Sequence, residues 1–282
     1  MKTLIINSTN FVVGSLNQYS YRFPENAKFE AGCGLGIAGI SIFNSFQNIN
    51  VDRGNNSLTY NFLGTIYTWT IPDGFYSVSE LNYFLQSQCV LNNLYVTTNN
   101  GLTFVYFIEL QVSTARYATS LNFFAVPTNS TATSLGYTKP TGATWSYPTT
   151  TTTPQLTFNG SFGELIGLNG GTYPVSPSST NVQFVSTFTP NINPINSIIF
   201  CCNLISSKYS IPNNILYSLP ISSTLGTLIQ VNPPSIVYNN IIPQRFSTIE
   251  ITLFDQAFNP LKVIDPDLTL TLSIMEPSDN GF

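Results

Sequence analysis

Two stretches near the C-terminal end of the chain alternate strictly between apolar and polar residues. They cover residues 248–253 and 268–274, and each carries Ile or Leu at every second position with Thr, Ser or Glu between them. A period of two is typical of strands in an antiparallel sheet that buries one face and exposes the other. The turn-like segment 254–261 lies between them, and it allows the two strands to pair as a hairpin.

Shorter apolar or alternating runs, separated by turn residues, predict further strands along the chain. They cover residues 3–6, 19–23, 35–46, 58–62, 68–71, 94–98, 102–110, 116–126 and 197–205. Asn100-Gly101 lies between two of these runs and favours a type I′ hairpin turn. About eight to ten strands with long inter-strand loops describe an all-β fold, an antiparallel β-sandwich or a jelly roll.

One short helix is predicted within this strand-rich pattern, directly after the turn residues Pro72-Asp73-Gly74. Ser77 and Glu80 fit a capping box, in which the Ser77 hydroxyl bonds the Glu80 amide while the Glu80 carboxylate reaches back. Apolar residues then recur at helical spacing and form one stripe, namely Val78, Leu81, Leu85 and Cys89. This pattern predicts a helix of about three turns that packs one face on a core.

Residues 127–160 form a polar stretch that is punctuated by Pro and Gly and contains Trp145. We expect an extended surface loop here rather than a linker between domains. A linker would separate two cores, and the residue pattern does not change from one side of the stretch to the other. The sequence therefore predicts one domain over residues 1–282.

The composition is unusual in its scarcity of charge. Of the 282 residues, 43% are apolar and only 8% are charged, with a net charge of −4, whereas about 25% charged residues is typical of soluble proteins. A surface built from Asn, Ser, Thr, Gln and Tyr is poorly protected against association, which suits a protein that packs against copies or partners. Composition alone fits a hydroxyl-rich extracellular β protein equally well.

Several function classes are disfavoured. The nine Lys and Arg residues are scattered singly and form no basic run, so we expect no nucleic-acid partner. No stretch approaches 18 apolar residues without charge, so we expect no membrane span. The apolar run at residues 4–6 ends too early for a signal peptide and is better explained as a first strand.

Catalytic and metal-binding chemistry is also hard to place. The chain has no histidine, which removes the commonest general base and metal ligand. Asp265-Pro266-Asp267 is the only close pair of carboxylates, and a solvated turn explains it better than a Ca²⁺ site. Glu109 and Glu164 lie in apolar runs, and we expect partly buried carboxylates at an ion pair or an interface rather than glycosidase acids. We therefore predict no catalytic, cofactor-binding or metal residues, no cofactor, and no enzyme.

The four cysteines are Cys33, Cys89 and the adjacent Cys201 and Cys202. Their spacing fits no metal-binding pattern, and we expect reduced thiols in or near the core. Cys201 and Cys202 fall in the predicted strand 197–205, where neighbouring side chains point to opposite faces, so at most one of the two is expected to be buried.

Four passages carry a resemblance to a known family. They are IPDGFYS (71–77) leading into ELN (80–82), FGELIGL (162–168) followed by GTYP (171–174), PPSIVY (233–238), and FSTIEITLFD (246–255) with the final strand. Together and in this order, over about residues 60–275, they resemble passages of the small capsid proteins of virophages and polinton-like viruses. The resemblance says little about residues 1–60 and 127–155.

This resemblance implies a penton protein, the minor capsid protein of the icosahedral vertex. It would be a single jelly roll that forms a homopentamer and closes the five-fold vertices. The major capsid proteins of these viruses carry two jelly rolls and are much longer than 282 residues, so length favours the penton. The implied neighbour is the double-jelly-roll major capsid protein, in a virion assembled in the host cytoplasm. The short helix would then cover an open flank of the sandwich.

The alternative is a carbohydrate-binding or adhesin-like β-sandwich module, such as a spike or fibre head. Such a module stacks exposed aromatic rings on sugars, and Trp145 in the polar stretch is its best candidate residue. The oligomeric state separates the two hypotheses, because a sugar-binding head is expected to be monomeric or trimeric.

Overall fold

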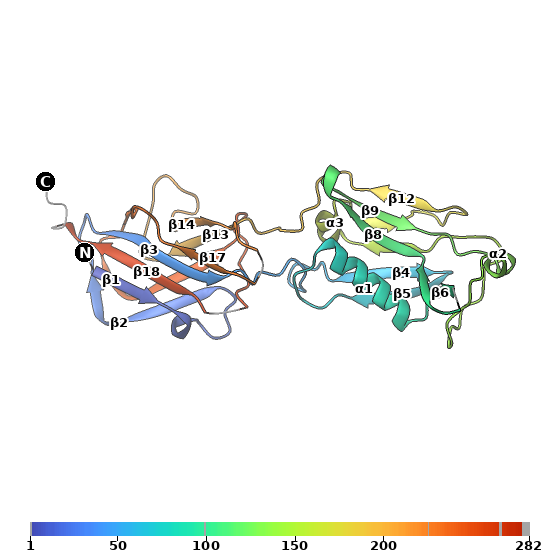
Figure 1. Cartoon of the computed structure of the whole chain (residues 1–282). Helices are drawn as coiled ribbons and strands as arrows, with labels where there is room; N and C mark the ends of the chain where they lie inside the picture. Colours follow the sequence, from blue (N-terminus) through green and yellow to red (C-terminus); the bar gives the residue numbers. More distant parts are fainter. Residues whose placement is uncertain (1, 99, 225, 265–266, 278–282) are drawn as a thin grey trace. The chain divides into compact units, whose positions relative to one another are not determined.

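The computed structural model describes residues 2–98, 100–224, 226–264 and 267–277. The chain divides into two compact units, one formed by Met1–Phe46 with Ile195–Phe282 and one by Gln47–Pro194. In Figure 1 the first unit is drawn in blue and in orange to red, and the second in cyan to yellow. We call them the roll unit and the inserted unit. The expected single domain over 1–282 therefore differs from the structure, in which two units each have a core of their own.

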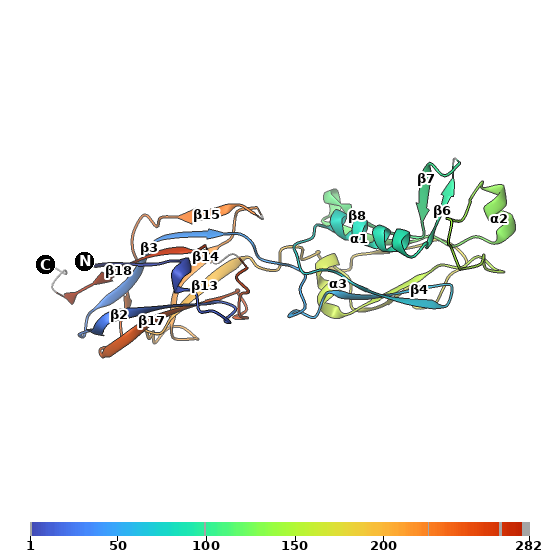
Figure 2. The same ribbon diagram turned by 90° about the horizontal axis from the view of Figure 1, so that it is seen from below.

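The roll unit consists of two antiparallel sheets. The first runs in the order β1 (Lys2–Ile6), β18 (Thr269–Met275), β3 (Gly34–Phe43), β15 (Leu228–Val231), with the short β16 (Asn239–Asn240) also pairing with β3. The second runs in the order β14 (Ile215–Pro220), β13 (Ser197–Cys202), β17 (Arg245–Phe254), β2 (Gln18–Lys28). Figure 2 shows β3, β18 and β15 in one layer and β2, β17 and β13 in the other.

The strand order is that of a jelly roll. Leaving out β16 and numbering the strands of this unit along the chain, the sheets read 1-8-3-6 and 5-4-7-2, so that successive strands pass from sheet to sheet except at one hairpin. This confirms the all-β, antiparallel jelly-roll fold predicted from the sequence. The inserted unit lies in the connection between the third and fourth of these strands, β3 and β13.

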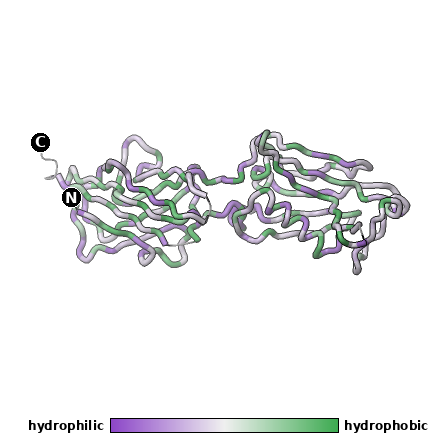
Figure 3. Tube along the Cα trace, viewed as in Figure 1, coloured by the Kyte–Doolittle hydropathy of each residue, from purple (hydrophilic) through white to green (hydrophobic). Residues whose placement is uncertain are grey.

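The two alternating C-terminal stretches form β17 and β18, as predicted, but they do not pair with each other. β17 pairs with β13 and β2, whereas β18 pairs with β1 and β3. The segment between them therefore crosses from one sheet to the other instead of forming a hairpin. Their apolar faces meet in the core between the sheets, where Ile249, Ile251 and Leu270 are fully buried. Figure 3 shows apolar positions recurring along the strands of both units.

The inserted unit combines short sheets with helices. One sheet runs in the order β11 (Gly171–Tyr173), β10 (Gln155–Phe158), β4 (Ser57–Phe62), β5 (Thr65–Thr70). Another runs β12 (Val182–Val185), β9 (Ala118–Phe123), β8 (Ile108–Ser113), and β6 (Tyr95–Thr98) pairs with β7 (Thr103–Tyr106) as a hairpin. The helices are α1 (Val78–Leu91), α2 (Asn129–Ser134) and α3 (Gly160–Ile166), and 3-10 turns occur at Ser8–Asn10 in the roll unit and Thr114–Arg116 here.

The predicted helix is α1, and its details are confirmed. The Glu80 amide donates to Ser77 Oγ at 3.2 Å, and the Ser77 amide donates to Glu80 Oε2 at 2.7 Å. The whole predicted stripe is buried, comprising Val78, Leu81, Leu85 and Cys89. The helix belongs to the core of the inserted unit, however, and not to a flank of the jelly roll.

Helix α1 lies beside β8, the edge strand of its sheet (Figure 1). The Asn82 side chain of the helix accepts a hydrogen bond from the Leu110 amide of this strand at 2.8 Å. An edge strand leaves some of its backbone groups unpaired. Helix α1 supplies a hydrogen-bond acceptor for one of them, the Leu110 amide, and at the same time buries the helix's own apolar face. That is the local role of a helix among the strands.

The stretch 127–160 is more structured than the extended loop that we expected. It contains α2, which begins after the N-cap Thr128, and it ends with β10, which pairs with both β4 and β11. Apart from the buried Ala132, helix α2 consists of Asn, Ser and Thr residues, so no apolar period marks it in the sequence. Three α-helices occur in the described part of the chain instead of one.

The predicted hairpin around Asn100-Gly101 is present between β6 and β7. Its pairing ends at Thr98 and Thr103, so the connection is longer than the two-residue turn that we expected. Asn100 and Gly101 do have positive φ values of 56° and 89°. Within the described ranges, no helix is long and apolar enough to span a membrane.

Candidate functional site

The ionisable groups do not gather into a site. Within the described ranges, no three His, Cys, Asp or Glu side chains lie close enough together to hold a metal ion. Glu109 is half-buried on β8, and Glu164 is exposed on α3. Asp265 and Pro266 lie outside the described residues, so the solvated turn at Asp265-Pro266-Asp267 stays a prediction.

All four cysteines are free and buried. The expectation that at most one of Cys201 and Cys202 is buried was wrong, since they are 2% and 1% exposed. Strand β13 lies between β14 and β17 in its sheet, and its face opposite the core is shielded as well. Burial raises the pKa of Cys89 to about 12, of Cys202 to about 12 and of Cys201 to about 11. The thiols of these three residues are therefore protonated and unsuited to nucleophilic chemistry.

Trp145 is not the open stacking platform that we expected of a sugar-binding module built on this residue. Its indole ring packs edge-on against Phe62 and against Tyr147, with 5.3 Å between ring centroids in each case. Lys139 Nζ lies 5.3 Å from the indole centroid, and the indole N–H donates to the Asn93 carbonyl at 2.7 Å. The ring thus fixes the polar stretch to the core of the inserted unit.

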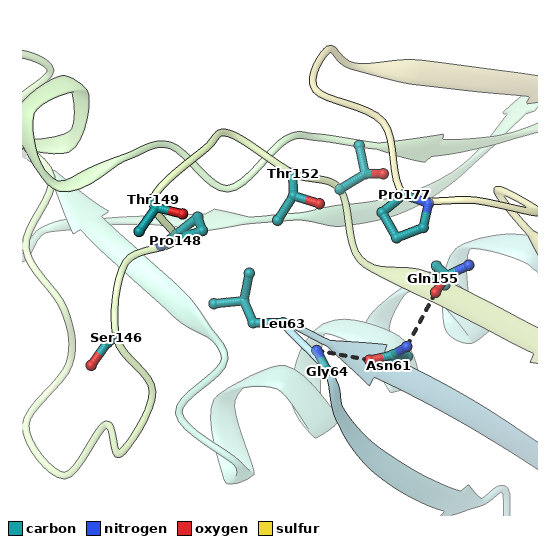
Figure 4. Close-up of a pocket in the computed structure, with 10 residues that line it drawn as sticks. Asn61, Leu63, Gly64, Ser146, Pro148, Thr149, Thr152, Gln155 and Pro177 are labelled. Atoms are coloured by element: carbon teal, nitrogen blue, oxygen red, sulfur yellow. Dashed lines mark hydrogen bonds between the residues drawn. The ribbon is translucent and has the colours of Figure 1, made fainter.

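A polar hollow of about 330 Å³ lies in the inserted unit, beside the turn that joins β4 to β5. We call it the Leu63 hollow. It is lined by Asn61, Leu63, Gly64, Ser146, Pro148, Thr149, Thr152, Thr153, Gln155 and Pro177. Figure 4 shows Leu63 between the segment 148–149 and the hydrogen-bonded pair of Asn61 and Gln155. No lining residue is charged, so the hollow is a neutral surface of hydroxyl, amide and apolar groups.

The two amide side chains of the hollow are held in fixed orientations. Asn61 accepts a hydrogen bond from the Gly64 amide at 3.0 Å and donates to Gln155 Oε1 at 3.1 Å. Gln155 Nε2 donates in turn to the carbonyls of Pro174 and Val175 at 2.9 and 3.2 Å. This chain of hydrogen bonds leaves neither amide free to rotate, and it forms one rigid wall.

Leu63 has an unusual backbone conformation at the edge of this wall. It and Gly64 form the two-residue turn between the paired residues Phe62 and Thr65, with φ values of 52° and 87°. Positive φ at both turn positions is the type I′ pattern, which strongly favours Asn, Asp or Gly at the first position. A bulky side chain in this region costs about 1–2 kcal/mol, and such strain concentrates at functional sites.

The hollow could not be located from the sequence. Its lining residues come from three segments separated by about 20 to 80 positions, and the Thr-rich part reads as a loop without chemistry. Leu63-Gly64 was the available signal, because a bulky residue before Gly in a tight hairpin departs from turn preferences. That signal appears only once the pairing of Phe62 with Thr65 is known.

No family model matches the chain, and no curated protein matches it either. Among solved structures, the chain is similar to the crystal structure of a selenomethionine-labelled mavirus penton protein, with 98% of each chain covered. The identity is 11% and the TM-score 0.43.

Proposed function

We propose that this chain is a structural capsid protein, specifically a penton protein whose homopentamers close the five-fold vertices of an icosahedral capsid. The observation that carries the proposal is the strand order of the roll unit, a complete jelly roll interrupted by an inserted unit between β3 and β13. Jelly rolls are widely used as capsid building blocks, although a fold alone does not fix a function. The four passages that resemble virophage and polinton-like capsid proteins agree with this assignment.

The surface chemistry also supports a role in assembly. Only 8% of the residues are charged, so repulsion between copies is weak. A ring of five subunits needs a heterologous interface, in which two different patches meet and the contact repeats until the ring closes. Many weak contacts of polar and aromatic surface then add up through multivalency.

The loop between β13 and β14 is the best candidate for such a contact in the roll unit. Tyr209 and Ile211 in this loop are 99% and 95% exposed. Burying one large apolar side chain stabilises an interface by about 1.5–3 kcal/mol. Two such side chains on one loop would therefore contribute substantially to a contact between subunits. Lys208 is the only charged residue next to them in the sequence.

The proposal includes the partners that a vertex protein has. Each pentamer would contact surrounding double-jelly-roll major capsid proteins, and the protein would be found in the virion after assembly in the host cytoplasm. No enzymatic activity, cofactor or nucleic-acid partner is part of the proposed role. The engaged ring of Trp145 gives no support to a carbohydrate-binding module built on that residue.

Negative-stain electron microscopy of the purified protein tests the proposal. Class averages with five-fold symmetry would support a vertex protein. Three-fold averages would instead support a spike or fibre head and contradict the proposal.

A further inference from the structure

We propose that the Leu63 hollow binds a neutral sugar residue. This inference concerns a surface of the inserted unit alone and does not rest on the capsid role. Its volume of about 330 Å³ lies at the lower end of the roughly 300–1,000 Å³ found for small-molecule sites, which suits one or two sugar rings better than a larger ligand.

The lining matches the chemistry of a sugar. Four residues with hydroxyl side chains line the hollow, namely Ser146, Thr149, Thr152 and Thr153. Thr153 Oγ1 accepts a hydrogen bond from the Ser178 amide at 2.9 Å, and among the described residues no side-chain hydrogen bond engages the hydroxyls of the other three. A hydroxyl both donates and accepts, so it pairs with a sugar hydroxyl in either direction. The rigid amide wall of Asn61 and Gln155 adds further acceptor capacity at fixed positions.

The apolar part of the lining complements this polar part. Leu63, Pro148 and Pro177 offer saturated carbon surface, against which the C–H face of a pyranose ring packs. Leu63 lines the hollow from a turn position with a positive φ of 52°. A binding role gives a physical reason for a Leu where the turn itself favours Asn or Gly.

The lining also argues against the main competitors. A nucleotide, a phosphate or an acidic peptide is bound most strongly where a cationic side chain pairs with it, and the ten lining residues include none. A purely apolar ligand would leave the hydroxyl and amide groups of the hollow without water or partner, which is costly.

Saturation-transfer difference NMR on the full-length protein tests the proposal, because this measurement works for large assemblies and weak ligands. The probes are the methyl glycosides of glucose, galactose, mannose and N-acetylglucosamine, each at millimolar concentration. We expect saturation transfer to at least one of them, with the strongest transfer to the ring C–H protons that face Leu63.

Two sets of variants locate the binding. Thr149→Val with Thr152→Val removes two hydroxyls without changing side-chain shape, and Leu63→Asn supplies a residue that the turn favours while removing the apolar contact. Each is expected to lower the saturation transfer at least fivefold. Thr68→Val with Thr70→Val is the matched control, because both residues are exposed on β5 and do not line the hollow.

Absence of transfer to all four glycosides would overturn the proposal, and so would transfer that the Thr149 and Thr152 variant leaves unchanged. Neither result bears on the pentamer, which is measured separately. A folded variant is verified by its circular dichroism spectrum and melting temperature.

Discussion

The buried side chain of Asn48 joins the two ends of the inserted unit to each other. Its Nδ2 donates to the carbonyl of Ile192 at 3.0 Å and to that of Tyr76 at 2.8 Å, while its Oδ1 accepts from the Tyr76 amide at 2.8 Å. Residue 48 lies next to the point where the chain enters the unit, and residue 192 next to the point where it leaves. The entering and leaving segments of the inserted unit are thus hydrogen-bonded to each other, and we infer that this unit folds independently.

Replacing Asn48 by Leu should therefore destabilise the inserted unit specifically. Asn48 is 0% exposed, so the change leaves buried carbonyl and amide groups without partners, at a cost of about 1–3 kcal/mol for each. Urea unfolding of the isolated fragment 47–194 measures the loss. The exposed Asn169→Leu is the control and should leave the midpoint nearly unchanged. If the Asn48→Leu fragment were as stable as the wild-type fragment, the Asn48 side chain would not stabilise the inserted unit by joining its two ends.

The capping box of α1 makes the stability of the inserted unit depend on pH. Hydrogen bonds from the Ser77 amide and hydroxyl lower the pKa of Glu80. The folded state therefore favours the ionised carboxylate. Its contribution to the free energy of unfolding is fully present above the pKa of the unfolded chain, about 4.3. This contribution is lost as the pH falls through the lower pKa of the folded state.

Two variants test this dependence. Glu80→Gln should flatten the pH dependence of the stability of fragment 47–194 as the pH falls below about 4.3, as measured by thermal unfolding at a series of pH values. Ser77→Ala should cost about 1 kcal/mol at neutral pH. A Glu80→Gln profile that follows the wild type throughout would show that the carboxylate contributes nothing.

The thiols should be unreactive in the native protein. All four are buried, and burial raises the pKa of Cys89 and Cys202 to about 12, far above neutral pH. Iodoacetamide at pH 7.5 should leave the native chain unlabelled by mass spectrometry, while the chain in denaturant takes up four labels. Rapid labelling of Cys89 or Cys202 under native conditions would contradict the burial described here.

Gly36 in β3 should tolerate no side chain. A Cβ at this position would lie 2.4 Å from Ile236 Cγ2 and 2.7 Å from the Val237 carbonyl oxygen, because the segment 236–237 crosses directly over the strand. Gly36→Ala is expected to destabilise the roll unit by about 1–3 kcal/mol through overpacking. Gly160→Ala, where a Cβ would meet open space, is the control in the same urea titration.

The loop that carries Tyr209 and Ile211 should matter for assembly and not for folding. Both side chains are almost fully exposed, so Tyr209→Ser with Ile211→Ser removes no packing within the monomer. We expect an unchanged melting temperature of the dissociated chain and a pentamer that dissociates at least tenfold more readily on dilution. Analytical ultracentrifugation measures the dissociation of the pentamer on dilution. If the double variant dissociated at the same concentration as the wild type, the loop would not be part of the interface.

Local signals in the sequence predicted local structure well. The alternation in residues 248–253 and 268–274 identified β17 and β18 and their buried faces, and the Ser77 and Glu80 pair identified the start of α1. Alternation tells which face of a strand is buried but not which strand lies beside it. The pairing of these two strands was therefore predicted wrongly.

The division into two units was not predicted from the sequence, because both units are strand-rich and both are poor in charged residues. The chain passes between them at Phe46-Gln47 and Pro194-Ile195, where composition does not change. The core of the roll unit also joins residues more than 200 positions apart, such as Ile6 and Leu270. The Leu63 hollow depends on the same kind of long-range proximity, which no single stretch of sequence contains.

Light scattering over a range of protein and salt concentrations gives the solution mass of the full-length protein and so tests whether it forms pentamers. For a pentamer we expect a discrete species of five times the 31.0 kDa chain mass. A discrete trimer, or a monomer that persists at every concentration and in the presence of the major capsid protein, would contradict it.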